Sequence, residues 1–280
     1  MNLFRHAVPC LLLLATLVAT GRAADLKGIE YSHPGGVRLR MDVHLPAGTG
    51  PFPAAILVHG GAWVAGGRRF DVRPLFKPLS DAGFAWFTIS YRLARKPPFS
   101  RSLIDASKIG DGIDDVQSAV QFVRSHAAEF HVDPDRIALI GESSGAQLAS
   151  MAAIRGAPVK AVVAFYCPSD LVAITRPPGV FREAVARVTW GRPAHPELLE
   201  LSPIAAVRAG MPPFLFIHGT SDHVVPFEQS TRMCDEIRRA GSSCEVIPVK
   251  GGLHGVQLWE ALHKTAYKRQ MTSWLSRRMD

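Results

Sequence analysis

The hydrophobic pattern changes character along the chain. From Val37 to Leu45 every second residue is apolar, an alternation typical of a strand with one exposed face. Gly35 and Gly36 come before it, so we expect a hairpin with a strand around Ile29–Tyr31. Later, short continuous apolar runs favour strands buried on both faces. These runs are Ala54–Val58, Ala85–Ile89, Ile137–Ile140, Val159–Phe165, Phe214–Ile217 and Cys244–Val249.

Helical segments separate these runs. Apolar residues recur with helical spacing from Ile113 to Val123, and Asp111 lies near the positive N-terminal end of that segment. Strand and helix alternate almost throughout, which predicts an α/β fold with a mainly parallel central sheet, right-handed crossovers and helices on both faces. The expected helices are Pro74–Ala82, Ile113–Ser125, Ala146–Ile154, Glu228–Ala240 and Trp259–Arg277.

One connection between two sheet strands is unusually long. Residues 168–213 contain several prolines and exceed the length of an ordinary loop. We expect a short helix around Phe181–Val188 and a small cap-like insertion beside the sheet.

The N-terminus reads as a targeting segment. Arg5 precedes the apolar run Ala7–Thr20, and Gly21–Ala23 supplies small residues for cleavage after Ala23. A membrane-spanning helix needs about 20 apolar residues, so an uncleaved anchor is the weaker alternative. We therefore expect residues 1–23 to be a signal peptide, with export to the periplasm or the medium and no stable membrane anchor.

Composition and charge narrow the class of protein. Of 280 residues 47% are apolar and four are cysteine, which excludes a disordered chain and a disulfide-framework miniprotein. The net charge of +8 falls to +6 without residues 1–23, because Arg5 and Arg22 are lost and no acid is. Basic residues come in scattered pairs such as Arg68-Arg69 and Arg277-Arg278, whereas a nucleic-acid surface needs clustering. We expect no nucleic-acid partner.

Cysteine and metal patterns add two expectations. Cys234 and Cys244 are close enough to pair across a turn at Gly241, and whether they form a disulfide stays open. Cys167 is expected to be a buried small hydrophobe. The chain has no H-E-x-x-H, paired C-x-x-C or Walker loop, so we expect no metal and no cofactor.

The strongest chemical motif follows the run Ile137–Ile140. Gly141–Gly145 reads G-E-S-S-G, a G-x-S-x-G sequence between a predicted strand and a predicted helix. A sharp turn there exposes the middle residue, Ser143, and only small residues at positions 141 and 145 let the neighbouring backbone pass. The helix that follows directs N–H groups and its positive end toward an oxyanion. Ser143 is therefore the predicted nucleophile.

A glycine pair follows the strand Ala54–Val58. The sequence His59–Trp63 is H-G-G-A-W, which leaves the N–H groups of Gly60 and Gly61 free to face a ligand. With the N–H of Ser144 they form the predicted oxyanion hole. His59 is expected to brace this loop.

The nucleophile requires a base and an acid. Asp222 comes directly after the run Phe214–Ile217, and His254 lies in a Gly-flanked loop after the next strand. Both therefore lie at the carboxyl edge of the sheet, where catalytic residues usually sit. The predicted catalytic set is Ser143, Asp222 and His254, in which the carboxylate fixes the histidine tautomer. Because His254 must be neutral to accept a proton, activity should fall on the acid side.

These motifs together resemble the α/β-hydrolase esterases and lipases with a His-Gly-Gly type oxyanion motif, in a branch like the feruloyl and acetyl-xylan esterases. Ser90–Leu93, Asp133–Ile137 and Met211–Phe214 add to the resemblance, which spans about residues 42–274. Ala62 and Ala146 stand where many relatives have glycine. The resemblance implies an α/β-hydrolase domain over residues 24–280 and a secreted serine esterase that acts on a small-molecule or polysaccharide-linked ester.

Two alternative functions stay open, and so does the identity of the residues that line the substrate pocket. The H-G-G-x-W form also resembles arylformamidases, which cleave an amide with the same triad. A non-catalytic hydrolase-like binding protein is the other alternative, and it would lack an activated serine. Four aromatic residues are consistent either with a substrate pocket or with core and cap packing. They are Trp63, Phe70, Phe181 and Trp190.

Overall fold

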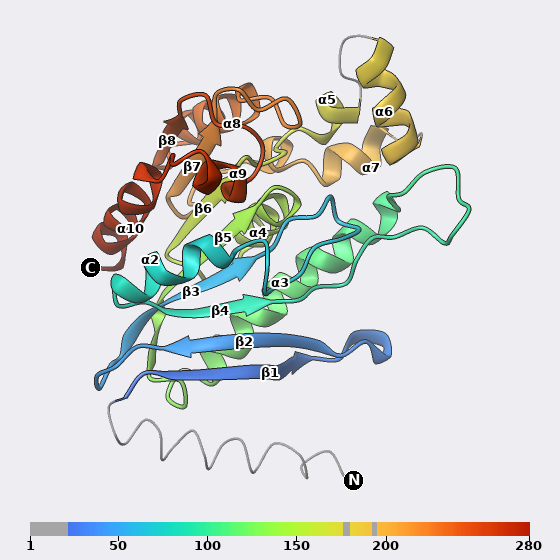
Figure 1. Ribbon diagram of the computed structural model, residues 1–280. Helices are drawn as coiled ribbons and strands as arrows, with labels where there is room; N and C mark the ends of the chain where they lie inside the picture. The colour runs from blue at the N-terminus through green and yellow to red at the C-terminus, as the bar shows by residue number, and fades with distance from the viewer. Residues whose placement is uncertain (1–21, 176–179, 192–194) are drawn as a thin grey trace.

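The computed structural model describes residues 22–175, 180–191 and 195–280 (Figure 1). Its strands form one sheet in the order β1-β2-β4-β3-β5-β6-β7-β8. The β1–β2 and β2–β4 pairs are antiparallel, and the remaining pairs are parallel, as predicted. The strands are β1 (Ala24–Ser32), β2 (Leu39–Leu45), β3 (Phe52–Val58), β4 (Ala85–Ile89), β5 (Val132–Glu142), β6 (Ala161–Phe165), β7 (Phe214–Gly219) and β8 (Cys244–Val249).

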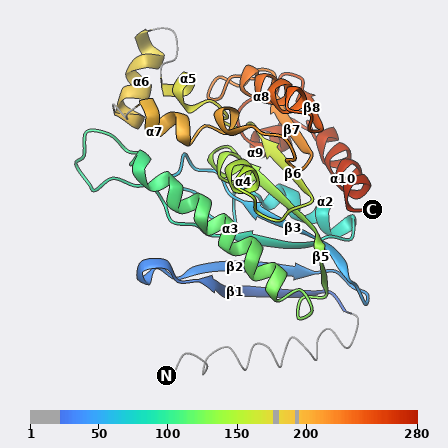
Figure 2. The same cartoon turned by 180° about the vertical axis from the view of Figure 1, so that it is seen from behind.

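Helices cover both faces of the sheet, which explains why the central strands are continuously apolar. Alternate residues of β5 serve the two cores: Leu139 packs with α3, α4 and α8, and Ala138 packs with α2, α9 and α10. Figure 2 shows α3 and α4 in front of the sheet. The helices are α2 (Phe76–Asp81), α3 (Ile109–Ser125), α4 (Ser144–Ile154), α5 (Leu171–Thr175), α6 (Val180–Trp190), α7 (His195–Glu200), α8 (Glu228–Arg239), α9 (Val256–Ala261) and α10 (Ala266–Met279).

Two expected boundaries are wrong. Val37 is 47% exposed and lies outside the sheet, because Pro34–Gly36 form a 3₁₀ turn and β2 begins only at Leu39. The single helix expected over Trp259–Arg277 is two helices, α9 and α10. The break falls where His263 takes a left-handed φ of 55° and Lys264 N–H returns to the carbonyl of Trp259 (2.8 Å).

The long connection after β6 carries more helix than expected. Its described part holds α5, α6 and α7 and the 3₁₀ helix η4 (Pro203–Ala206), and the three α-helices gather at one end of the molecule (Figure 1). Residues 168–213 are called the insertion below. Its role as a cap stays a prediction, as does the signal peptide, because residues 1–21 lie outside the described part. No helix in that part is long and apolar enough to cross a membrane.

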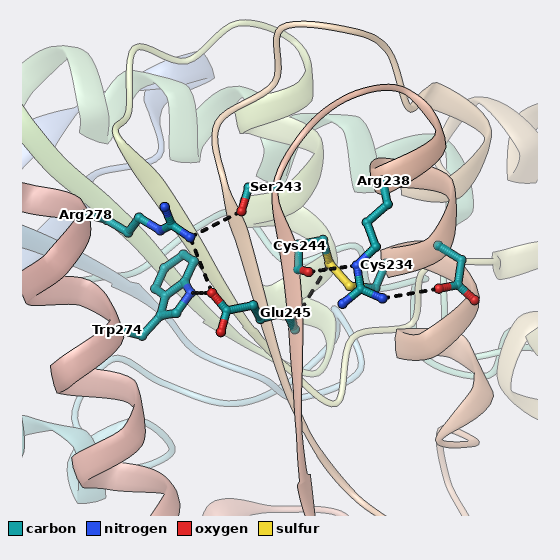
Figure 3. The surroundings of a disulfide bond; sticks show 8 residues. Cys234, Arg238, Ser243, Cys244, Glu245, Trp274 and Arg278 are labelled. Carbon is teal, nitrogen blue, oxygen red and sulfur yellow. Dashed lines mark hydrogen bonds and ion pairs between the residues drawn. A yellow bond between two sulfur atoms is a disulfide. The ribbon is translucent and has the colours of Figure 1, made fainter.

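A disulfide joins Cys234 of α8 to Cys244 of β8 (Figure 3). Both cysteines are buried, and Arg238 Nε donates to the carbonyl of Cys244 (2.9 Å). On the other side of β8, Glu245 accepts a hydrogen bond from the indole N–H of Trp274 (2.7 Å). The edge strand β8 is thus bonded to helices on both faces of the sheet. The Cys234–Cys244 disulfide, which the sequence left open, is present. Cys167 is free and buried.

Replacing both Cys234 and Cys244 with alanine should lower the free energy of unfolding by about 2–3 kcal/mol, since the bond closes a short loop in the unfolded chain. Urea unfolding of the oxidised protein and the variant measures the difference. Reduced wild-type protein is the control and should match the variant. A variant as stable as the oxidised protein would show that the bond contributes nothing.

Candidate active site

Ser143 lies on a sharp turn between β5 and α4. Its backbone φ is 52° and ψ is −121°, a combination rare for a residue with a side chain. A Cβ at Gly141 would lie 2.3 Å from the carbonyl oxygen of Gly145, and a Cβ at Gly145 would lie 2.3 Å from that of Val58. Neither position tolerates a side chain, which confirms the steric reason for both glycines. The turn exposes Ser143 at the carboxyl edge of the sheet.

The three predicted catalytic residues are brought together by hydrogen bonds. His254 Nε2 lies 3.0 Å from Ser143 Oγ, and His254 Nδ1 lies 2.7 Å from Asp222 Oδ2. Asp222 Oδ1 accepts the backbone N–H groups of Val224 (2.8 Å) and Val225 (2.9 Å). One carboxylate oxygen is therefore held by backbone donors while the other faces the histidine. With Nδ1 carrying a proton for Asp222, Nε2 is the nitrogen that can accept one from Ser143.

The surroundings of Asp222 favour its charged form. Burial alone disfavours the charge, but hydrogen bonds from His218 and His254 outweigh burial and lower the pKa of Asp222. His218 Nε2 lies 3.4 Å from Asp222 Oδ2 and 3.0 Å from the carbonyl of Val225. His218 Nδ1 lies 2.7 Å from Ser230 Oγ, so a second, fully buried histidine stands behind the carboxylate. No motif in the sequence predicts this role for His218.

The glycine pair lies directly against the turn at Ser143. A Cβ at Gly60 would lie 3.2 Å from the carbonyl oxygen of Glu142 and 3.4 Å from Ser143 Cβ, so a side chain there would require the backbone before the nucleophile to shift slightly. Gly61 has a φ of 117°, and a Cβ there would meet the carbonyl of Ala65 at 2.2 Å. Within the described chain, the backbone N–H groups of Gly60, Gly61 and Ser144 make no hydrogen bond to protein. They are available as donors to a ligand oxygen.

His59 has the contacts expected of a brace. Its Nδ1 lies 2.7 Å from the carbonyl oxygen of Gly60, and its ring stacks on Tyr91 at 4.4 Å between centroids. Burial lowers the pKa of His59, so the neutral ring is favoured. A neutral ring with its proton on Nδ1 donates to the Gly60 carbonyl and fixes the start of the loop.

Tyr166 and Glu142, which no sequence motif assigned to the site, support the loop that carries His254. Tyr166 packs its ring edge-on against His254 at 4.6 Å, and its hydroxyl accepts the backbone N–H of Val256 (3.2 Å). The same hydroxyl donates to Oε2 of Glu142 (2.9 Å), and Glu142 is the residue before the nucleophile. This chain of contacts links the turn at Ser143 to the loop of His254. Glu142 is part of the motif itself, but nothing in the sequence connects it to Tyr166.

Glu142 is wholly buried, and desolvation raises its pKa well above the ordinary value of 4.5. A carboxyl whose pKa is raised by folding stabilises the native state fully below its ordinary pKa and less as the pH rises toward the folded-state value. Glu142→Gln keeps an acceptor for Tyr166 and does not titrate. Above pH 4.5 the wild type should lose stability relative to this variant. The difference between their free energies of unfolding should grow by up to about 1.4 kcal/mol per pH unit.

Urea unfolding at pH 5 and pH 8 compares the two proteins. The advantage of Glu142→Gln should be larger at pH 8. An equal difference at both pH values would mean that this carboxyl is ionised in the native state as it is in the unfolded state.

The four predicted pocket residues do not form one group. Trp63 and Trp190 are buried and meet edge-on at 5.0 Å, inside the main core. Phe70 is 75% exposed and lines a hollow of about 600 Å³ whose lining includes Arg73, Lys77 and Gln257 and none of the three catalytic candidates. The side chain of Phe181 lies outside the described residues. The structure therefore places two of the four as packing residues, and a shared pocket lining stays a prediction.

No cluster of three or more His, Cys, Asp or Glu side chains that could hold a metal ion occurs in the described part of the chain. The arrangement at Ser143 instead offers a nucleophile, a base with an acid behind it, and free backbone donors. These are the groups that acyl transfer through a serine nucleophile requires.

Comparison with known proteins agrees with this geometry. The model of the BD-FAE family matches residues 41–237. A probable carboxylic ester hydrolase of Mycobacterium tuberculosis, LipM, is 30% identical over 68% of this chain and 46% of its own length. The chain spans about half the length of the curated relatives that it matches.

Solved esterases share the fold. A truncated carbohydrate esterase from gut microbiota is 25% identical with a TM-score of 0.75, over 92% of this chain and 97% of that one. A thermophilic esterase of the planctomycete Thermogutta terrifontis is 27% identical with a TM-score of 0.69, over 89% of each chain. The family model covers more than half of the sequence and these esterases share the fold, so the chain belongs to the BD-FAE family of α/β-hydrolase esterases.

Proposed function

We propose that the protein is a carboxylic ester hydrolase that forms an acyl-enzyme on Ser143. The observation that carries this proposal is the hydrogen-bonded series from Asp222 through His254 to Ser143, at a turn flanked by free N–H groups. Membership of the BD-FAE family and the esterase names of its relatives support the same class of reaction.

The reaction begins when His254 Nε2 takes the proton of Ser143 Oγ, which attacks the ester carbonyl carbon. The carbonyl π electrons move to oxygen, and the N–H groups of Gly60, Gly61 and Ser144 stabilise the resulting oxyanion. The oxyanion collapses, the C–O bond to the alcohol breaks, and His254 returns the proton to the leaving oxygen. Asp222 stabilises the imidazolium between these two transfers.

Water completes the cycle on the acyl-enzyme. His254 removes a proton from water, the hydroxide attacks the acyl carbon, and the second oxyanion occupies the same donors. Collapse releases the carboxylic acid and returns the proton to Ser143. The two half-reactions use one base and one oxyanion hole, so no cofactor is required.

For the substrate, we propose short acyl or feruloyl esters carried on carbohydrate. The likeness to a carbohydrate esterase and to the BD-FAE family supports this choice. Hydrolysis rates should be compared over acetyl, butyryl, long-acyl and feruloyl esters, with an N-formyl arylamide included. We expect acetyl and feruloyl esters to lead. Preference for the formyl amide would favour the arylformamidase-like alternative, and no turnover with no serine labelling would favour a binding protein.

We also propose that the protein is exported after cleavage at Ala23. The Cys234–Cys244 disulfide supports this, because such bonds persist in oxidising compartments. N-terminal sequencing of protein recovered from the periplasm and medium should begin at Ala24. Recovery of the uncleaved chain from the cytoplasm would overturn the proposal.

A further inference from the structure

The segment His59–Trp63, called the oxyanion loop below, ends in two residues that are held in a strained conformation. Ala62 and Trp63 have φ values of 51° and 62°, in the left-handed region that residues with side chains rarely adopt. Two such residues in succession persist only where the surroundings hold them. The contacts of Trp63 therefore bear on where the N–H groups of the loop point.

Three contacts hold Trp63. Its carbonyl accepts the N–H of Ala94 (2.8 Å), and its ring meets that of Trp190 at 5.0 Å, near the end of α6. Its indole N–H donates to Gln147 Oε1 (2.8 Å). The hydrogen bond to Gln147 is the contact that ties the loop to the helix of the nucleophile.

Gln147 is fully buried and lies four residues after Ser143, one turn along α4. Its Nε2 donates to the carbonyl of Leu201 (2.8 Å), at the end of α7 in the insertion. An indole N–H only donates and a carbonyl only accepts, so the amide of Gln147 has one satisfied orientation. The amide oxygen therefore bonds to the oxyanion loop, and the amide nitrogen bonds to the insertion.

The acceptor at Leu201 is itself fixed. The next residue, Ser202, is buried, and its hydroxyl accepts the N–H of Leu171 (2.9 Å) and donates to the carbonyl of Leu198 (2.7 Å). The start of α5 and the end of α7 are thereby joined beside Gln147. The bridge thus runs from the base of the insertion, through one amide, to the oxyanion loop.

We propose that Gln147 is a positioning residue that couples the base of the insertion to the oxyanion loop, so that the loop N–H groups keep their places only while both ends of the amide are bonded. This inference rests on the proposed esterase function. The oxyanion donors act mainly on the charge that develops in the transition state. Loss of the bridge should therefore lower kcat and leave KM nearly unchanged.

The first test removes each bond of the amide. Gln147→Met fills a similar volume without a strong donor or acceptor, and Trp63→Phe removes the indole N–H. Both should lower kcat for an acetyl ester about 10- to 100-fold, since small displacements of catalytic groups have effects of that size. Affinity for a trifluoromethyl ketone, which forms an oxyanion adduct with the serine, should fall in parallel with kcat.

The matched control is Trp274→Phe. Trp274 is buried in α10, and its indole N–H donates a hydrogen bond of similar length to Glu245 (Figure 3). Its ring packs in the core on the opposite face of the sheet from the buried residues of the insertion. This variant should lose thermal stability comparable to that lost by Trp63→Phe and keep its kcat. The comparison separates loss of stability from loss of alignment.

The second test uses Gln147→Glu. When protonated, the new carboxyl can still accept from Trp63 and donate to the carbonyl of Leu201, whereas its ionised form cannot donate. The ratio of variant to wild-type kcat should therefore be near one in acid and fall as the pH rises. Near-UV circular dichroism at each pH verifies that the variant is folded, so the ratio reports alignment.

The outcomes are distinguishable. If wild-type protein hydrolyses no ester, the proposed function fails, and the coupling role that rests on it fails with it. If the wild type is active and folded Gln147→Met keeps kcat within about twofold, or loses only KM, the coupling role is overturned. A ratio for Gln147→Glu that is as far below one in acid as at high pH would overturn the assigned direction of the amide, because the protonated carboxyl should make both bonds.

Discussion

Ser143→Ala is expected to lower turnover of a short p-nitrophenyl ester by about 10³-fold or more, and to abolish labelling by a fluorophosphonate. The change removes the hydroxyl oxygen that lies 3.0 Å from His254 Nε2. The fold should survive, because the backbone N–H of residue 143 still donates to the carbonyl of Phe165. Alanine meets the same left-handed φ as serine, so the turn gains no new strain.

Ser150→Ala is the control for this variant. Ser150 is a buried serine on α4, the helix that follows Ser143, and its hydroxyl lies 3.8 Å from the thiol of Cys167. Turnover and labelling should both persist in that variant. Full turnover by Ser143→Ala would instead remove Ser143 as the nucleophile, and with it the proposed mechanism.

The fold was predictable because its signals are local. Continuous apolar runs gave the positions of β3 to β8, since a strand covered by helices on both faces has no polar side to break the run. The boundaries that failed depend on single backbone conformations. Examples are the left-handed φ of His263 between α9 and α10 and the turn at Pro34–Gly36, which apolar periodicity does not report.

The site was predictable in part for the same reason. Ser143, Asp222 and His254 each follow a sheet strand, and carboxyl ends of parallel strands meet at one edge. Tyr166 and Gln147 act across the fold: Tyr166 is 90 residues from Val256, and Gln147 is 84 from Trp63. A single sequence has no signal for such pairs, because each partner has an ordinary neighbourhood in the chain.

The roles of the aromatic residues could not be predicted from the sequence for a related reason. Trp63 stands beside the glycine loop in sequence, which suggested a ligand contact, but its indole N–H is used by Gln147 and its ring by Trp190. Sequence proximity to a catalytic loop does not reveal which way a side chain points. The same residue nevertheless bears on the site through the backbone that it holds.

Asp222→Asn is the second large effect, and its direction follows from the hydrogen bonds of the carboxylate. The N–H groups of Val224 and Val225 both donate to Oδ1. In the variant these two donors require the amide oxygen, so the amide NH₂ must turn toward His254. His254 Nδ1 then accepts a hydrogen bond instead of donating one, so the ring proton lies on Nε2. That tautomer cannot take the proton of Ser143, and kcat should fall about 10⁴-fold.

Asp115→Asn is the matched control for this change. Asp115 is buried like Asp222, and it pairs with Arg92 (2.7 Å) away from the catalytic set. That variant should unfold at a lower temperature and keep its kcat, whereas Asp222→Asn should lose kcat in fully folded protein. Because Ser143 still carries its hydroxyl but has no base, fluorophosphonate labelling of Asp222→Asn should slow by a similar factor. Labelling at the wild-type rate would show that Asp222 does not set the tautomer of His254.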